Sequence, residues 1–195
     1  MSLRKWIQVV KLDLSDFSSE KARIKYTCAN RAIVISRNYP EELYPDFNFF
    51  TRLLESENNI FKWTAIKVIG NLSKVDIKKK VDKILPSLIA LLSNKSMITA
   101  ANTIGALSEI ALNKPKYTEV IIPALLKVEK ARYYQKGKIS PECRNVAIGH
   151  VIKSFEKLGK NVYCRKDVQA FLKRQTRNTR PKVRELSKKL LIKTI

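Results

Sequence analysis

The stretch that decides the fold is KWTAIKVIGNL at residues 62–72, together with MITAANTIGAL at residues 97–107, which begins 35 residues later. In both, a small residue stands three positions after the first residue, and apolar residues stand seven and ten positions after it. That spacing places the small and apolar side chains on one face of an α-helix. A pattern that returns after such an interval indicates stacked helical repeats, in which each unit buries its apolar face against the next.

The same pattern extends in both directions along the chain. Weaker copies start at Lys25, Arg144 and Arg184. Strand signals, such as an Asn-Gly turn between alternating apolar runs, are almost absent from the sequence. The sequence therefore predicts an all-α protein of about five antiparallel helix pairs, forming a single domain over residues 1–195. The first helices of these pairs are expected at residues 3–13, 41–55, 78–92, 116–131 and 163–175.

Two of these first helices carry a proline in matching surroundings, ILPSL at residues 84–88 and IIPAL at residues 121–125. A proline inside a helix removes one backbone hydrogen bond, so its return at the same place in the repeat predicts a shared bend. With the Ala65…Ile69-Gly70 pattern of the second helix, these features resemble the HEAT-repeat family of armadillo-type helical repeats. The resemblance covers nearly all of the chain. It implies a right-handed α-solenoid that acts most often as an adaptor between proteins.

Composition restricts the class of function. The 195 residues include 39 Lys and Arg against 17 Asp and Glu, a formal charge of +22, and 45% of the residues are hydrophobic. Such a chain is able to bury a sizeable core, unlike a disordered polybasic tail. Residues 127–195 hold 20 of the cations and only 5 of the acids. We therefore expect a folded protein whose basic surface is densest toward its C-terminal end and whose partner is anionic.

The sequence shows no strong catalytic or metal-binding motif. Its three cysteines form no Cys-x-x-Cys pair, and the single histidine, His150, lies seven residues after Cys143 on one expected helix. Two helical turns separate these two side chains by about 10 Å, too far for direct hydrogen bonding. Because His150 shares its register position with Val68, we expect a partly buried packing histidine. The sequence thus predicts no catalytic residue, no metal, no cofactor, no small-molecule substrate and no membrane insertion, in a cytoplasmic protein with reduced thiols.

The second helix of each pair should line the concave face, so its positions that point away from the seam are candidate contacts. Two rows of such positions contain no acid, which suits an anionic partner, although exposed helix faces carry Lys and Asn in any case. The last pair adds several arginines, whose planar guanidinium group fits phosphate. The candidate anion-binding residues are Lys67, Asn71, Lys74, Asn102, Lys153, Arg174, Arg177, Arg180, Arg184, Lys189 and Lys193.

A basic and aromatic segment lies inside the fourth pair, at residues 130–138. We expect an extended helix end or a loop there, solvated by its lysines. The alternative is a contact surface in which Tyr133 or Tyr134 stacks on a base while neighbouring cations meet phosphates.

Three functions remain open from the sequence. The first is a non-enzymatic scaffold that binds an anionic macromolecule, nucleic acid being favoured over an acidic protein, through backbone and shape contacts. The second is a protein–protein adaptor that uses the concave face or the nearly neutral pair at residues 85–125. The third is a DNA glycosylase, because HEAT-like glycosylases place a carboxylate where Glu109 would face the concave side. Trp63 is instead expected to pack between repeats.

Overall fold

Helices make up nearly all of the architecture. The computed structural model describes residues 12–193. Its elements in chain order are η2 (Leu14–Ser18), α1 (Ala22–Asn38), α2 (Pro40–Leu43), α3 (Phe47–Leu53), α4 (Asn59–Leu72), η3 (Ser73–Val75), α5 (Lys80–Ala90), η4 (Leu91–Ser93), α6 (Met97–Asn113), η5 (Pro115–Tyr117), α7 (Thr118–Leu126), η6 (Lys127–Lys130), β1 (Tyr134–Gln135), β2 (Lys138–Ile139), α8 (Pro141–Leu158), α9 (Lys160–Tyr163), α10 (Lys166–Gln175) and α11 (Pro181–Ile192).

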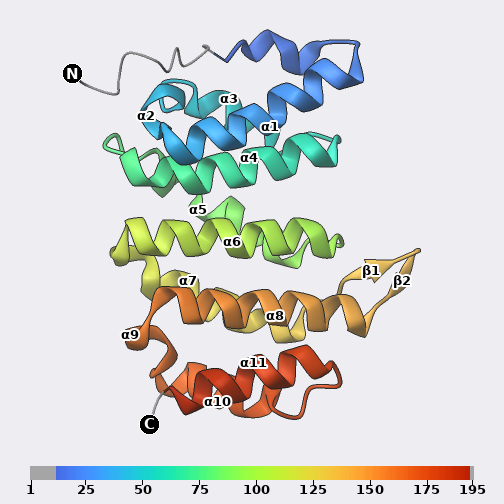
Figure 1. Ribbon diagram of the computed structural model, residues 1–195, viewed down its shortest axis with the longest axis vertical. Helices are drawn as coiled ribbons and strands as arrows, with labels where there is room; N and C mark the ends of the chain where they lie inside the picture. Colours follow the sequence, from blue (N-terminus) through green and yellow to red (C-terminus); the bar gives the residue numbers. More distant parts are fainter. Residues whose placement is uncertain (1–11, 194–195) are drawn as a thin grey trace, which may run out of the picture.

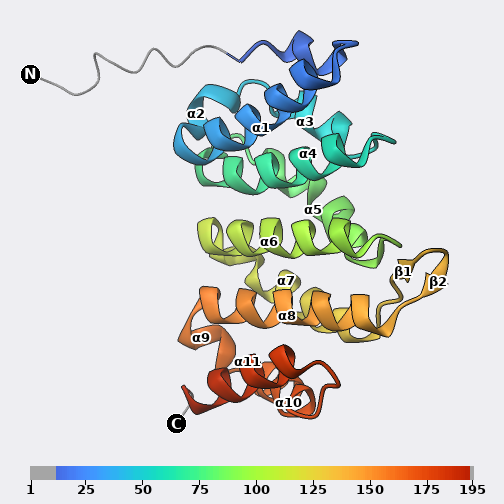
Figure 2. The ribbon, with the colours of Figure 1, turned by 45° about the vertical axis from the view of Figure 1, so that its right-hand side comes forward.

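The helices stack into an elongated, two-layered array. The long helices α1, α4, α6, α8 and α11 lie side by side in sequence order, and α3, α5, α7 and α10 lie behind them (Figure 1). Turning the molecule by 45° preserves this order, with α1 and α11 toward opposite ends of the stack (Figure 2). The predicted all-α solenoid is therefore confirmed. Part of the first expected helix, residues 3–11, lies outside the described residues.

Short helical elements at the junctions refine the expected helix pairs. The turns η3 and η5 precede α5 and α7, and the four-residue α9 precedes α10. The helix expected at residues 41–55 is divided into α2 and α3 around Pro45, which has no backbone N–H to continue the first of them. By contrast, Pro86 and Pro123 lie inside α5 and α7 on exposed positions, so that the carbonyls they leave free can reach water.

The core lies between the two layers and follows the repeat register. In α4 and α6, the residues three, seven and ten positions after Lys62 and Met97 are at most 1% exposed. The two helices approach most closely at Gly70, where an added Cβ would lie 2.9 Å from the Cα of Ala106 and 3.0 Å from its Cβ. Trp63 bridges the same helices, as predicted, because its Nε1 donates a hydrogen bond to Thr99 Oγ1 at 2.9 Å.

A buried carboxylate joins three consecutive parts of the stack. Asp76, which is 3% exposed, accepts hydrogen bonds from the Tyr44 hydroxyl at 2.7 Å and from the backbone N–H groups of Lys80 and Val81 at 2.7 and 3.1 Å. The ammonium of Lys114, which follows α6, lies 3.4 Å from its Oδ2. Asp76 therefore satisfies the free N–H groups at the start of α5 and fixes the ends of two neighbouring helices to it.

A small antiparallel hairpin departs from the all-α pattern. Tyr134 pairs with Ile139, and Gln135 with Lys138. Lys136 and Gly137 form the turn with φ angles of 50° and 77°, as the primed hairpin turns require. The sequence predicts a loop or a helix end here, because Lys-Gly is a weaker turn signal than Asn-Gly. The hairpin projects from one edge of the stack (Figures 1 and 2).

Candidate nucleic-acid interface

A groove runs over α6 on the layer of long helices. Toward this surface α6 presents mainly small residues, among them Ala101 and Gly105, whereas α4 and α8 on either side present longer ones. An added Cβ at Gly105 would meet no atom within 4 Å. The difference in side-chain size leaves a cavity of about 300 Å³, which we call the α6 groove. Its lining residues are Arg37, Lys67, Asn71, Ala101, Asn102, Ile104, Gly105, Ala106, Ser108, Glu109, His150, Lys153, Ser154 and Lys157.

The α6 groove is positively charged. Arg37 from α1, Lys67 from α4 and Lys153 from α8 form no ion pair with any of residues 12–193. Lys157 pairs with Glu109, the one acid among the lining residues. Three cations thus surround the cavity without a compensating carboxylate, and this arrangement attracts anions.

His150 lies in this groove and not in the seam where we expected it. The prediction of a partly buried packing histidine is wrong, since its side chain is exposed while Val68, at the same register position, is buried. It lines the α6 groove together with small residues of α6, among them Ala101 and Gly105. The surrounding protein still removes part of its hydration, and with the Lys153 ammonium this lowers the pKa of His150 below its usual 6.5.

Four of the predicted contact residues meet in the α6 groove. They are Lys67, Asn71, Asn102 and Lys153. Asn71 also donates a hydrogen bond to Ser36 Oγ at 2.9 Å, which orients its amide between α4 and α1. The structure places two other predicted residues elsewhere: Lys74 is exposed in η3 and Lys189 is exposed on α11.

The groove also contains residues that the two predicted rows missed. Arg37 and Glu109 both lie three positions beyond the second row. Extending that row by one helical turn would have found them. Lys157 lies four positions beyond the same row, also about one helical turn, whereas His150 has no such signal.

The predicted arginines of the C-terminal helices are largely engaged within the protein. The guanidinium of Arg174 pairs with Glu129 at 2.8 Å, and Arg180 pairs with Glu142. Arg184 donates to the backbone carbonyls of Asn178 and Thr179, both at 3.0 Å. These interactions join the last unit to the preceding one and stabilise the turn before α11. These internal contacts explain part of the arginine content of the C-terminal helices, so that part requires no external ligand.

The two remaining predicted residues at this end of the chain differ in their environment. Lys193 pairs with Glu156 at 2.6 Å, and the pKa of this lysine is raised by the carboxylate. Arg177 has no ion pair with the described residues and borders a shallow hollow with Lys173 and Leu191.

Ion pairs between distant positions share one direction. In each of them the acid comes first in the chain and the cation follows 34 to 48 residues later, about one repeat on. From Asp76 onward, carboxylates of one unit are thus neutralised by cations about one repeat later. The pairs are Asp76–Lys114, Asp82–Lys116, Glu109–Lys157, Glu119–Arg165, Glu129–Arg174, Glu142–Arg180 and Glu156–Lys193.

The two tyrosines of the hairpin segment have different roles. Tyr133 is fully buried, and its hydroxyl donates to the Leu92 carbonyl at 2.8 Å. Stacking of Tyr133 on a base, one of the predicted alternatives, is therefore wrong, and burial raises the pKa of its hydroxyl to about 12. Tyr134 is 37% exposed on β1, with the Lys95 ammonium 5.9 Å from its ring centroid. Only Tyr134 remains available for stacking.

Comparison with known proteins supports the class of fold. No family model matches the chain, and no curated protein matches it. A designed armadillo repeat protein of known structure is similar over 93% of this chain and 80% of its own, with a TM-score of 0.59 and 16% sequence identity. At this identity the likeness concerns the fold alone.

The fold therefore defines this protein as a helical-repeat protein. More particularly, it is an α-solenoid of the armadillo and HEAT-like type. In the part of the chain that the structure describes, no helix has the length and apolar character to cross a bilayer. Residues 12–193 also contain no group of three or more His, Cys, Asp or Glu side chains placed to hold a metal ion.

Proposed function

We propose that this protein is a non-enzymatic helical-repeat scaffold that binds nucleic acid through the α6 groove. The observation that supports the proposal is the set of three cations, Arg37, Lys67 and Lys153, around a concave surface without carboxylate partners. In contrast, Arg174, Arg180 and Lys193 already contact carboxylates, so an anion gains less from them.

The residues of the groove fit phosphate groups better than base edges. Arg37 offers a planar guanidinium, and Lys67 and Lys153 act as point charges. Asn102 adds an uncharged amide between them, and Gly105 leaves room for a sugar–phosphate backbone. Binding by such groups is insensitive to sequence and depends on salt, because each phosphate contact releases condensed counterions. Three contacts predict that log Kd rises with log salt with a slope of about 2 to 3.

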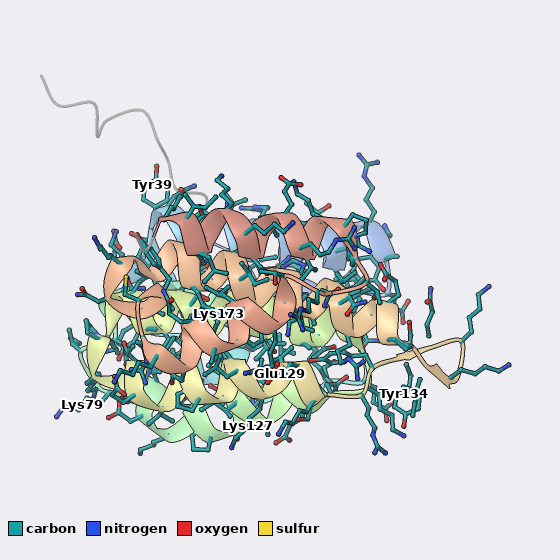
Figure 3. The ribbon with its side chains drawn as sticks, turned by 90° about the horizontal axis from the view of Figure 1, so that it is seen from below. Tyr39, Lys79, Lys127, Glu129, Tyr134 and Lys173 are labelled. Carbon is teal, nitrogen blue, oxygen red and sulfur yellow. The ribbon has the colours of Figure 1, made fainter. Side chains whose placement is uncertain are left out.

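A fluorescence anisotropy titration tests this proposal. Labelled single-stranded and duplex oligonucleotides are titrated with protein at two salt concentrations. The double variant Lys67→Glu/Lys153→Glu should lose at least tenfold in affinity at unchanged helical content. Its matched control is Lys83→Glu/Lys127→Glu, which makes the same charge change on two other exposed lysines. Figure 3 looks along the stack from below and shows Lys127 on the opposite face of the molecule from α11.

The control separates a local site from a general effect of charge. Affinity in the control variant should fall by less than about threefold, since exposed charges beyond a Debye length of about 10 Å are largely screened. Equal losses in the two double variants would mean that the α6 groove is not the site. No salt-sensitive binding at micromolar protein would overturn the proposed function itself.

A protein-adaptor function is the second candidate, and a separate surface favours it. A hollow of about 540 Å³ between α5 and α7 has mostly apolar walls, among them Ile89, Leu92 and Ala124. A protein partner that persists in a pull-down after nuclease treatment, and that is lost on Ala124→Glu, would support this function. Release of the partner by nuclease would oppose it.

A glycosylase function has weaker support. Glu109 does line the α6 groove, but it is held in an ion pair with Lys157. Incubation with alkylated DNA, with Glu109→Gln as the control, tests it directly. No released base from the unaltered protein would remove this alternative.

A further inference from the structure

The α6 groove holds the only imidazole in the chain. His150 stands on α8, one turn before Lys153 and two turns before Lys157, with its side chain exposed to the groove. Register alone would have buried it in the seam. We therefore ask which ligand of the groove an exposed imidazole among cations would contact.

The charged groups around the groove disfavour a proton on this imidazole when the groove is empty. They are Arg37 from α1, Lys67 from α4, Glu109 from α6, and Lys153 and Lys157 from α8. Glu109 is occupied by Lys157, so the surplus of charge that His150 experiences is positive. Loss of hydration in the groove, followed by the Lys153 ammonium, lowers the pKa of His150.

A phosphate that enters the groove compensates the positive charge around His150. A phosphodiester carries one negative charge and offers oxygen atoms that accept hydrogen bonds from N–H groups, including both N–H groups of a protonated imidazole. With the phosphate between Lys67 and Lys153, the positive surplus is compensated and protonation of His150 becomes favourable. The proton comes from solvent, one for each groove occupied.

We propose that His150 is a phosphate-contacting residue of the α6 groove and that it takes up a proton when a phosphodiester backbone binds. This inference rests on the proposed function and assigns a further contact within the same site. Binding and protonation are then linked, so each favours the other.

The linkage fixes the sign of the pH dependence. A bound phosphate raises the pKa of His150 above its value in the free protein, so affinity increases as the pH falls through the interval between the two values. A rise of one unit corresponds to a tenfold gain for the protonated form. Between pH 8.0 and 6.0, where carboxylates stay ionised, we expect the wild-type protein to gain about three- to tenfold in affinity.

Oligothymidylate is a suitable probe, because thymine does not titrate in this pH range. Anisotropy titrations at constant ionic strength are made with the wild type, His150→Gln and His150→Lys. The Gln variant should bind with little pH dependence. The Lys variant, which carries its charge throughout, should bind at pH 8.0 about as tightly as the wild type does at pH 6.0.

Proton NMR measures the titration midpoint of His150, which would not change if the residue had only a structural role. Because the chain has one histidine, its imidazole resonances need no assignment. Their titration midpoint should shift to higher pH when oligothymidylate is added.

An unchanged midpoint, or equal pH dependence in wild type and His150→Gln, would overturn this inference while leaving the proposed function intact. Absence of salt-sensitive binding by the wild type at every pH would overturn the proposed function instead.

Discussion

Two glycines one repeat apart should respond in opposite directions to the same substitution. In Gly70→Ala, the new methyl group would lie 2.9 Å from the Cα and 3.0 Å from the Cβ of Ala106, well inside the usual 3.5–4.0 Å between carbon atoms. Relieving this overlap requires α4 and α6 to separate, at about 1–3 kcal/mol for an overpacked core. The gain in helix propensity offsets about 0.5–1 kcal/mol of this.

Gly105→Ala is the matched control, because its methyl group would meet no atom within 4 Å. Without a steric overlap, this substitution only increases helix propensity, so we expect the variant to be about 0.5–1 kcal/mol more stable than the wild type. Gly70→Ala should be about 0.5–2 kcal/mol less stable. For a chain of this size the two melting temperatures should differ by roughly 3–10 °C.

Thermal and urea unfolding followed by circular dichroism at 222 nm measures both differences. A Gly70→Ala variant as stable as Gly105→Ala would refute the close contact of α4 and α6 and, with it, the description of how the repeats pack.

The remaining predictions concern single side chains. Asp76→Ala should destabilise the protein by about 3–5 kcal/mol, because it leaves the buried N–H groups at the start of α5 and the Tyr44 hydroxyl without their acceptor; urea unfolding measures this loss. Tyr133→Phe should cost about 1 kcal/mol at neutral pH without changing oligonucleotide affinity, whereas Tyr134→Ala should weaken single-strand binding by about 1 kcal/mol or more if that ring stacks on a base. Because burial raises the pKa of Tyr133 to about 12, its contribution to stability is complete below about pH 10 and is lost as the pH rises through 12, which spectrophotometric titration of tyrosinate follows. Desolvation raises the pKa of the buried Cys28 thiol to about 11, so a thiol reagent at pH 8 should label the exposed Cys164 well before Cys28.

The repeat register made most of the fold predictable. Ala65, Ile69 and Leu72 recur as Ala100, Ile104 and Leu107, and such a recurrence indicates a seam between units whatever the surrounding sequence. Elements of two to four residues escaped prediction, because helical periodicity needs more than one turn to be visible. The hairpin at residues 134–139 has one turn residue, Lys136, that ordinarily avoids positive φ.

The candidate site was only half predictable, for a physical reason. Exposure of Lys67 and Lys153 follows from the register of their own helices. The cavity between them depends instead on the small side chains of α6 relative to both neighbours. Similarly, nothing near Arg174 in the sequence indicates its pairing with Glu129, since the two lie 45 residues apart.

The ion pairs between units give the stack a polarity, because the acid always precedes the cation in the chain. From Asp76 onward, carboxylates pair with cations of the following unit on the C-terminal side. In the last unit, however, Asp167 and Glu185 pair with Arg165 and Lys182 of their own unit. Within residues 12–193, cations such as Lys173 and Arg177 therefore border the hollow at α10 without a carboxylate partner. Whatever packs on that side has to bring acids, so a second copy that offered it the cations of an ordinary unit would be repelled.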